Sequence, residues 1–325
     1  MTDEPRPVPY AEPGTIVATG TPELAAELEL AYETGVGVTA RSQWRYVLRR
    51  FVRHRLAVAS LVLLVVIFVA GALASHIAPY GLDEIDLGNT SAGPTLHGSH
   101  FFGTDQIGRD YFSRVLFGIR TSERVALLVA ALSTLIGTTI GATAGYYRGL
   151  VDNLLMRLTD LVLTLPALAV LLTASAFLGR GSPTRVAVIL ALLFWTTLAR
   201  IVRGTFLSLR EKEYVEAARA AGARDLRIIV RHMLPNAAGP IIVNATLTVG
   251  LAILVEAVLS FLGFGVQPPT PALGKLIADG QNSAASQWWL VTFPGLTIVL
   301  IVLCVNFVGD GLRDALDPTQ RKVRA

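Results

Sequence analysis

Long apolar runs dominate the pattern of hydrophobic and polar positions along the chain, and shorter polar segments separate them. Each run is close to the about 20 residues that an α-helix needs to cross a hydrocarbon layer. Strands of a membrane barrel would instead show segments of about ten residues with alternating polarity. The pattern therefore predicts six transmembrane helices, at Leu56–Ala74, Val125–Ala144, Leu161–Leu178, Val186–Val202, Ala237–Leu262 and Leu290–Val308.

The composition agrees with a membrane protein. Of the 325 residues, 52% are hydrophobic and 16% are charged, and the mean hydropathy is +0.54. Water-soluble domains carry about 25% charged residues. The single cysteine, Cys304, excludes an internal disulfide, and the five histidines do not show the spacing of metal ligands. We therefore expect an all-α, polytopic integral membrane protein without a metal site.

The distribution of Lys and Arg predicts the orientation, because cytoplasmic loops are enriched in these residues. With a cytoplasmic N-terminus, 21 of the 28 basic residues fall on the cytoplasmic side and 7 on the opposite side. Both termini are therefore expected in the cytoplasm. Aromatic residues interleave with a basic cluster just before the first helix, which favours an anchor at the lipid surface over a nucleic-acid site. The cluster comprises Arg41, Arg45, Arg49, Arg50, Arg53 and Arg55.

Five segments follow from these boundaries. The first is acidic and rich in proline, which is typical of a disordered tail. Asp110 can cap a surface helix at Tyr111–Arg120 in the extracytoplasmic segment. The segments are a cytoplasmic tail (1–40), a basic anchor with the first transmembrane helix (41–80), an extracytoplasmic loop with a surface helix (81–124), a five-helix core with a long cytoplasmic loop at 203–236 (125–308) and a cytoplasmic C-terminal tail (309–325).

The loop at 203–236 is long, highly charged and helical in composition. An alanine-rich stretch that begins at Glu216 favours a helix, and Gly222 ends it. A second helix is expected at Asp225–Met233, before Pro235 opens the fifth transmembrane helix. We expect two short helices at an angle to each other, outside the bilayer.

An alanine-rich helix offers a thin surface that fits a groove on another protein. Glu216 and Arg219, at its edge, could fix the register of such a contact. Movement of a soluble partner could then move the fourth and fifth transmembrane helices. The alternative interpretation is an amphipathic loop that only lies on the membrane surface.

The motifs of this loop resemble a known family. Glu216-Ala217-Ala218, followed by Gly222 and then by Leu234-Pro235, resembles the EAA signature of binding-protein-dependent ABC importer permeases. His232 stands where that signature has an isoleucine. Outside the loop, FGTDQIGRDYFSRVLFGIR (102–120), EAVLSFLGFGVQPPTPALGKLI (256–277) and GDGLRDALDP (309–318) are similar to the second permease chain of the dipeptide, oligopeptide and nickel branch. The resemblance extends from about residue 45 to the end of the chain.

This resemblance implies a type I ABC importer permease-like fold with cytoplasmic coupling helices, in a prokaryotic plasma (inner) membrane. A second homologous permease, two ATP-binding domains that hold ATP and Mg, and an extracytoplasmic substrate-binding protein would complete the importer. The chain itself is expected to hold no cofactor and no catalytic residue, since it has no G-x-x-x-x-G-K-[ST] phosphate loop. The residues implied in ATPase coupling are Tyr214, Glu216, Ala217, Ala218, Arg219, Gly222, Leu234 and Pro235.

Small residues recur every four positions on the second transmembrane helix, at Ser133, Gly137, Gly141 and Gly145. Such spacing lets two helix backbones approach closely in a membrane. We expect a tight helix interface, either within this chain or with the other permease. Pore lining is the alternative.

Glu256 is the only acidic residue within the six predicted transmembrane helices. A charge there costs about 3 kcal/mol, so this side chain should face protein or water. In one interpretation Glu256 and Asn244 line the translocation path, where they would meet a peptide amine or a metal cation. In the other, Glu256 is a neutral or paired carboxyl bonded to neighbours such as Asn244, Ser260 or another helix.

The favoured function is therefore the transmembrane permease of an ATP-driven importer for di- or oligopeptides. Nickel, haem-like molecules and oligosaccharides are the alternatives within the same branch. An ion-driven secondary transporter is less favoured, because inverted repeats and several intramembrane acids are not seen. A membrane-embedded enzyme would need a nucleophile, a base or metal ligands at one depth, and the sequence shows none.

Overall fold

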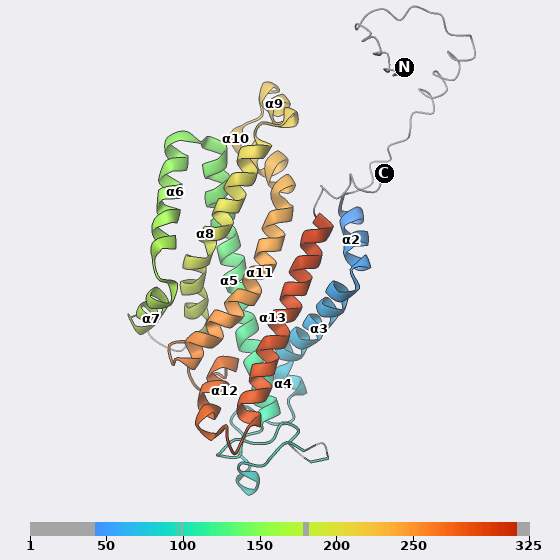
Figure 1. Cartoon of the computed structure of the whole chain (residues 1–325), viewed down its shortest axis with the longest axis vertical. Helices are drawn as coiled ribbons and strands as arrows, with labels where there is room; N and C mark the ends of the chain where they lie inside the picture. The colour runs from blue at the N-terminus through green and yellow to red at the C-terminus, as the bar shows by residue number, and fades with distance from the viewer. Residues whose placement is uncertain (1–42, 96, 99, 178–181, 317–325) are drawn as a thin grey trace, which may run out of the picture. The chain divides into compact units, whose positions relative to one another are not determined.

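The computed structural model describes residues 43–316 except 96, 99 and 178–181 (Figure 1). The chain divides into two units, Met1–Tyr46 and Val47–Ala325, and nearly all described residues belong to the second. Regular structure in the described part is helical, apart from an isolated β-bridge between Thr104 and Asp110. The predicted acidic tail at 1–40 and the last nine residues of the predicted C-terminal tail lie outside the described residues.

Five helices of the described part are long and apolar enough to cross a membrane. A sixth candidate is a pair of helices bent by 83°. The prediction of six transmembrane helices agrees with the structure when this pair counts as one. The five are α3 (Arg55–Ala72), α5 (Tyr111–Tyr147), α8 (Pro183–Leu209), α11 (Leu234–Phe261) and α13 (Trp289–Leu316). α11 continues without a break from α10 (Asp225–Arg227) through a π-helical segment (Ile228–Met233). The bent pair is α6 (Gly149–Thr164) and α7 (Ala167–Phe177).

Short helices and turns complete the described part. α2 (Gln43–Arg53) precedes α3, and α4 (Ala74–Ile77) follows it. The loop to α5 contains a 3-10 turn at Leu87–Asn89, and a second one at Gln281–Ser283 follows α12 (Leu273–Gly280). α9 (Glu213–Ala220) stands alone between α8 and α10, at one end of the long helices (Figure 1).

α5 corrects one predicted boundary. The surface helix expected at Tyr111–Arg120 and the second transmembrane helix are a single helix. Asp110 caps it as expected, because its Oδ2 accepts a 2.8 Å hydrogen bond from the Ser113 N–H. No glycine or proline separates Arg120 from Val125, so the helix continues without a break.

α6 and α7 show that the prediction for the third transmembrane helix, Leu161–Leu178, was wrong in its bounds. α6 begins at Gly149, within the segment that was assigned to a cytoplasmic loop. It ends at Leu165, whose ψ of 133° is extended. Pro166 explains the break, because proline has no N–H and disfavours helical backbone in the residue before it.

The second helix of the loop at 203–236 is also different from the expectation. It is the first part of the long helix that becomes α11, so it is not separate from the fifth transmembrane helix. Pro235 lies in the first turn of α11, where N–H groups have no partner within their own helix. The proline therefore does not break the helix.

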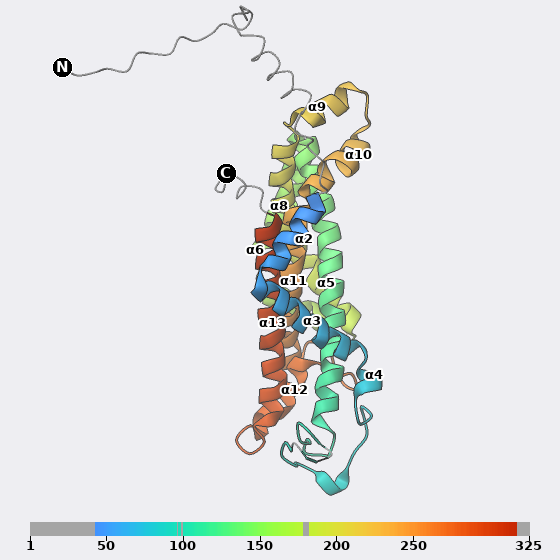
Figure 2. The same cartoon turned by 90° about the vertical axis from the view of Figure 1, so that its right-hand side faces the viewer.

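The long helices α5, α8, α11 and α13 lie side by side (Figures 1 and 2). Two clusters of buried side chains hold them together. The larger cluster joins α5, α8 and α11 with α12 and α13, and Ile253, Leu273 and Ile301 are among its fully buried members. The smaller cluster lies where α5 and α8 end, next to α9. α13 also packs against α3. The two clusters therefore lie at opposite ends of α5. The smaller one lies next to the loop at 203–236, which the sequence analysis assigned to ATPase coupling.

Candidate coupling site and membrane cavity

α9 is fixed to the long helices through one buried side chain. Val215 is fully buried in the smaller cluster, with Phe206 of α8, Tyr146 of α5 and Met233 of the π-helical segment. Burial of a valine side chain contributes roughly 1.5–3 kcal/mol. Val215 therefore places α9 in direct packing contact with α5, α8 and the π-helical segment that leads into α11. The sequence analysis missed Val215, although it is the one branched apolar residue among the charged and alanine positions of this helix.

The other face of α9 is free in this structure. Tyr214, Glu216, Ala217 and Arg219 are exposed, whereas Ala218 is half-buried against the smaller cluster. Ala217 is small, whereas Tyr214, Glu216 and Arg219 carry long polar side chains. This face therefore combines exposed polar groups with a short alanine surface.

A glycine-dependent turn ends α9. The N–H of Ala223 donates to the Ala218 carbonyl at 3.1 Å, and the N–H of Gly222 donates to the Arg219 carbonyl at 2.9 Å. These two bonds form a Schellman motif, which needs a left-handed residue at its centre. Gly222 has φ of +79°, and a Cβ there would meet nothing within 4 Å. Gly222 is therefore required by backbone conformation and not by lack of space.

The structure separates the two residues of the predicted Leu-Pro pair. Leu234 is half-buried and packs against the smaller cluster that holds Val215. Pro235 is exposed at the start of α11. Only Leu234 therefore belongs to the contact between α9 and the long helices.

Polar contacts tie the loop around α9 to the end of α5. The Tyr146 hydroxyl donates a 2.6 Å hydrogen bond to Oδ1 of Asp225, and the Arg210 guanidinium lies 5.9 Å from the centre of the Tyr146 ring. Arg148 forms a 2.7 Å ion pair with Glu211, and the hydrogen bond from Arg148 lowers the pKa of Glu211. The loop is therefore held to α5 both before and after α9.

The small residues of α5 face α8 within this chain. A Cβ on Gly137 would lie 2.6 Å from the Trp195 carbonyl oxygen, and one on Gly145 would lie 2.6 Å from Cβ of Phe206. Gly141 meets the backbone of α8 even more closely, at Ala199. Ser133, one turn earlier, is also buried. The sequence left open whether these small residues pack within this chain or against the other permease. In the structure they pack within this chain, against α8.

Two ion pairs join α6 to α8, and the sequence analysis missed both. Arg203 binds Asp152 through Nε and Nη2, and its Nη2 lies 2.7 Å from Oδ2. Arg200 lies 2.6 Å from Asp160. The four charges are visible in the sequence, but the predicted boundaries put Arg200 at the end of the fourth transmembrane helix, Arg203 in the loop that follows, and both aspartates before the third. The early start of α6 brings them together.

α6, α8 and α11 line a cavity of about 380 Å³. A second cavity, of about 550 Å³, lies between α8, α11 and α13, and Asn244 and Leu247 line both. The walls of the first are mainly apolar, with Thr196, Thr197 and Thr248 as further polar residues. Leu165 and Ala167, at the bend between α6 and α7, also line it. The bend therefore opens onto this cavity.

Glu256 lies apart from Asn244 and is fully buried. Its two carboxylate oxygens accept hydrogen bonds from Ser122 of α5 at 2.8 Å and from Ser260 at 2.6 Å. The Ser260 hydroxyl in turn accepts the Val266 N–H at 3.1 Å. At about 1.5 Å per residue, Asn244 and Glu256 are on the order of 18 Å apart along α11. The geometry therefore favours the second interpretation of Glu256, a carboxyl bonded to its neighbours.

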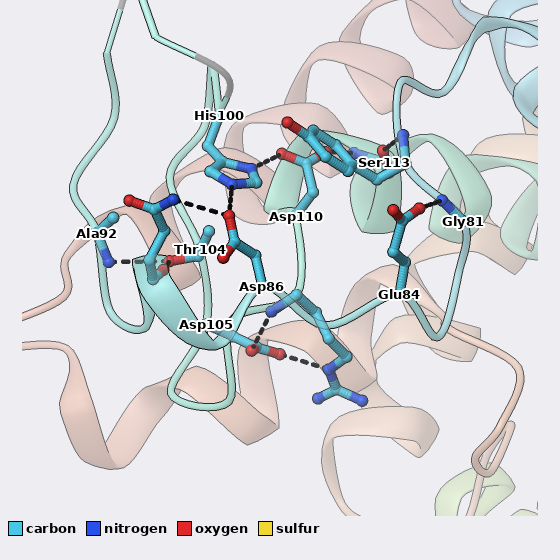
Figure 3. Close-up of polar contacts among 12 residues, drawn as sticks. Gly81, Glu84, Asp86, Ala92, His100, Thr104, Asp105, Asp110 and Ser113 are labelled. Atoms are coloured by element: carbon cyan, nitrogen blue, oxygen red, sulfur yellow. Dashed lines mark hydrogen bonds and ion pairs between the residues drawn. The ribbon is translucent and has the colours of Figure 1, made fainter.

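At the other end of α5, the loop before it contains a buried polar cluster (Figure 3). Nδ1 of His100 lies 2.9 Å from Asp110, and Nε2 lies 3.5 Å from Asp86. The Tyr80 ring stacks on the imidazole at 4.7 Å. A hydrogen bond from Asn89 and one from the Gly88 N–H lower the pKa of Asp86. These contacts order the loop, and the sequence analysis recognised only the capping role of Asp110.

Long helices around a cavity, with an exposed short helix fixed to their ends, define a membrane transport subunit. Residues 137–322 match the family described as binding-protein-dependent transport system inner membrane component. Residues 42–94 match the N-terminal transmembrane domain of oligopeptide transport permease C. The chain belongs to the family of binding-protein-dependent transport system inner membrane components.

Curated relatives cover most of the chain. The chain is 43% identical over 284 residues to the oligopeptide transport system permease protein OppC of Escherichia coli K12, which is 87% of this chain and 94% of that protein. It is 42% identical to OppC of Mycobacterium tuberculosis H37Rv, over 86% of this chain and 95% of the relative. A putative peptide transport permease of Brucella abortus is 44% identical, over 83% and 90%. These relatives confirm the resemblance to the oligopeptide branch.

A solved structure confirms the fold. The chain is similar to a chain of the inward-facing MetNI methionine ABC transporter, with a TM-score of 0.51 and 18% sequence identity. The match covers 63% of this chain and 96% of the other. The fold is therefore that of a type I ABC importer permease, as the sequence predicted.

Proposed function

We propose that this chain is one of two permease subunits of an ATP-driven importer of di- or oligopeptides. The observation that carries the proposal is the attachment of α9, whose exposed face is backed by the buried Val215 on three long helices. Family membership supports the permease role, and the peptide transport named for the relatives supports the substrate class. Nickel, haem and oligosaccharides are the alternatives of the same branch.

We place α9 and both termini on the cytoplasmic side of the inner membrane. The excess of Lys and Arg on the α9 side supports this orientation. The loop that contains His100, together with α12, then faces the extracytoplasmic side, because it lies at the opposite end of α5 (Figure 1). The predicted anchor at 41–55 would lie at the cytoplasmic surface of the lipid.

The partners in this proposal are a second homologous permease, two ATP-binding domains and an extracytoplasmic binding protein. One ATP-binding domain receives the exposed face of α9, where Tyr214, Glu216, Ala217 and Arg219 lie. Its closure on ATP and Mg moves α9, and the Val215 cluster passes the movement to α5, α8 and α11. ATP hydrolysis takes place in the partners, and this chain supplies the transmission and half of the path.

For the translocation path we propose the cavity between α6, α8 and α11. Asn244 supplies a hydrogen-bonding group to an otherwise largely apolar wall. Such a surface suits peptides of varied sequence, because it offers few specific contacts to any one side chain. For Glu256 we propose a structural role, in which its carboxyl joins α5 to α11 through Ser122 and Ser260.

Reconstitution of the assembled importer in liposomes tests the proposal. We expect uptake of a labelled tripeptide that requires internal ATP and the external binding protein, and that vanadate blocks. The same vesicles with labelled nickel, haem or a trisaccharide provide the substrate controls. Peptide uptake by the isolated chain, driven by an ion gradient without ATP, would overturn the proposal in favour of a secondary transporter.

A further inference from the structure

A buried arginine on the extracytoplasmic side forms no ion pair with a carboxylate among the residues that the structure describes. Arg114 lies in the first turns of α5, and only 8% of its surface is exposed. Its Nε is buried and has no hydrogen-bond partner among the described residues. A charge so deeply buried is almost always paired. An anion from outside the chain is therefore expected next to Arg114.

Arg114 lines a cavity of about 120 Å³ between the start of α5, the loop before it and α12. Asp105, Arg109 and Asp279 also line this cavity, and the field of the two carboxylates acts on Arg114. Each carboxylate already forms an ion pair with another basic side chain, Asp105 with Arg109 at 2.7 Å and Asp279 with Lys275. When both pairs are counted as neutral, the charge that remains is the positive charge of Arg114.

The other polar groups of the cavity do not replace the missing anion. The Tyr111 hydroxyl points to the carbonyl oxygens of Leu290 at 2.6 Å and Leu276 at 3.2 Å. The mouth of the cavity is formed by Gln106 and Ile107, which are exposed, and by the half-exposed carboxylate of Asp279. A group that enters from the extracytoplasmic solution can therefore reach Arg114.

Size and chemistry decide what this group is. Pockets for whole small molecules have roughly 300–1,000 Å³, so this cavity fits one functional group on a short stem. A guanidinium is planar and binds carboxylates through two parallel hydrogen bonds. The cavity therefore suits the end of an aspartate or glutamate side chain and is too small for a peptide substrate.

We propose that the Arg114 cavity receives an acidic side chain of the extracytoplasmic binding protein when that protein docks. The inference rests on the proposed function, which supplies this partner. It adds the docking residue and the chemistry that this residue recognises. The ion pair would form only in the docked complex, out of contact with water, and would couple docking to the first turns of α5.

The test uses the assembled importer in nanodiscs and its cognate binding protein loaded with tripeptide. Arg114→Gln keeps a hydrogen-bonding side chain but removes the charge, and we expect the affinity for the binding protein to fall about tenfold to a hundredfold. Arg124→Gln is the matched control, since Arg124 is exposed on the same helix, and it should leave the affinity unchanged. Arg114→Lys should recover part of the loss.

Substitution of each exposed acidic residue of the binding protein, one at a time, identifies the partner side chain. We expect one of these substitutions to weaken binding to the wild-type importer. The same substitution should cause no further loss of affinity for the importer that carries Arg114→Gln. If Arg114→Gln fails to assemble, Arg114→Lys, which keeps the charge, takes its place in this comparison. Absence of such a residue overturns the inference.

Two further outcomes separate this inference from its rivals. If acetate stabilises the importer only when Arg114 is present, while binding-protein affinity does not depend on Arg114, the cavity is a site for free anions and the inference fails. If the wild-type importer shows no uptake that depends on the binding protein, the proposed function fails. If Arg114→Gln shows normal peptide uptake and unchanged affinity for the binding protein, the docking role of Arg114 is wrong, whereas the proposed function stands.

Discussion

The hydroxyl of Tyr146, at the end of α5, donates a 2.6 Å hydrogen bond to Asp225, the first residue of the helix that becomes α11. Two long helices that are far apart in the sequence are thus joined directly behind α9. In the proposed mechanism, this bond makes α5 and α11 respond together when α9 moves. Its loss should therefore affect transmission as well as stability.

Tyr146→Phe removes this hydrogen bond while the ring stays in place. We expect the importer to lose about 1 kcal/mol of stability and to transport less peptide per ATP hydrolysed. Parallel measurements of thermal unfolding, uptake and phosphate release check this. Tyr147→Phe is the control, because Tyr147 is its half-exposed neighbour and its hydroxyl forms no hydrogen bond with the part of the chain that the structure describes. Equal coupling in both variants would contradict the role of the bond.

Gly222→Val should uncouple ATP hydrolysis from transport. Valine at φ of +79° costs on the order of 1–3 kcal/mol, so the turn after α9 opens and α9 loses its position. Asparagine adopts left-handed backbone far more readily, so Gly222→Asn should keep most of the uptake. The ratio of peptide taken up to ATP hydrolysed distinguishes them. A similar ratio in both variants would show that the left-handed turn is not needed.

Gly141→Ala should destabilise the helix pair α5 and α8. The added Cβ would collide with the Ala199 carbonyl, and such overpacking costs about 1–3 kcal/mol. The control is Gly204→Ala in α8, where a Cβ meets nothing within 4 Å and alanine is the better helix former. Thermal unfolding of the purified importer should show a loss for the first variant and no loss for the second. A loss in Gly204→Ala as well would argue against specific packing at Gly141.

Acidification should loosen the loop before α5 only at low pH. Hydrogen bonds from Asn89 and Gly88 lower the pKa of Asp86 in the folded chain. A lowered folded pKa means that Asp86 contributes stability above its unfolded pKa of about 4 and that this is lost as the pH falls through the folded pKa. Hydrogen exchange at Gly88, corrected for the intrinsic rate, should stay slow from pH 7 to 5 and become faster below this range.

Asp86→Asn is the reference for that measurement. Its exchange at Gly88 should show no corresponding change with pH, because the titrating group is absent. If wild type and Asp86→Asn lose protection over the same pH range, another group controls the loop.

The hydrophobic pattern predicted the five long apolar helices, and its count of six holds when α6 and α7 are taken as one crossing. Helix propensity predicted α9, because such a short helix depends on local composition. The hydrophobic pattern placed the starts of the second and third transmembrane helices too late in the chain, at Val125 and Leu161. α5 starts at Tyr111 and α6 at Gly149, since polar residues such as Asp152 are tolerated in a helix once Arg203 of another helix pairs with them. Tertiary partners of this kind cannot be read from one apolar run.

The same limit applies to the candidate site. The EAA-like motif located α9 and Gly222. Glycine is needed at position 222 because of the backbone conformation of that residue alone, so a local motif can indicate it. Val215 was missed because its importance comes from burial against Phe206 and Met233, which are brought to it by other helices. The role of Glu256 likewise depends on Ser122, a residue of α5 that no spacing along α11 could indicate.

The break between α6 and α7 bears on the inside of the membrane. In α6, the Leu161 carbonyl accepts the Thr164 hydroxyl at 2.8 Å, and the Val162 carbonyl accepts the Leu165 N–H at 3.3 Å. The carbonyl groups of Leu163 and Thr164 come after these bonds, and hydrocarbon offers such groups no hydrogen-bond donor. Leu163 and Leu165 line the cavity that Asn244 also lines. In the proposed translocation path, the bend would therefore offer backbone acceptors to a passing peptide.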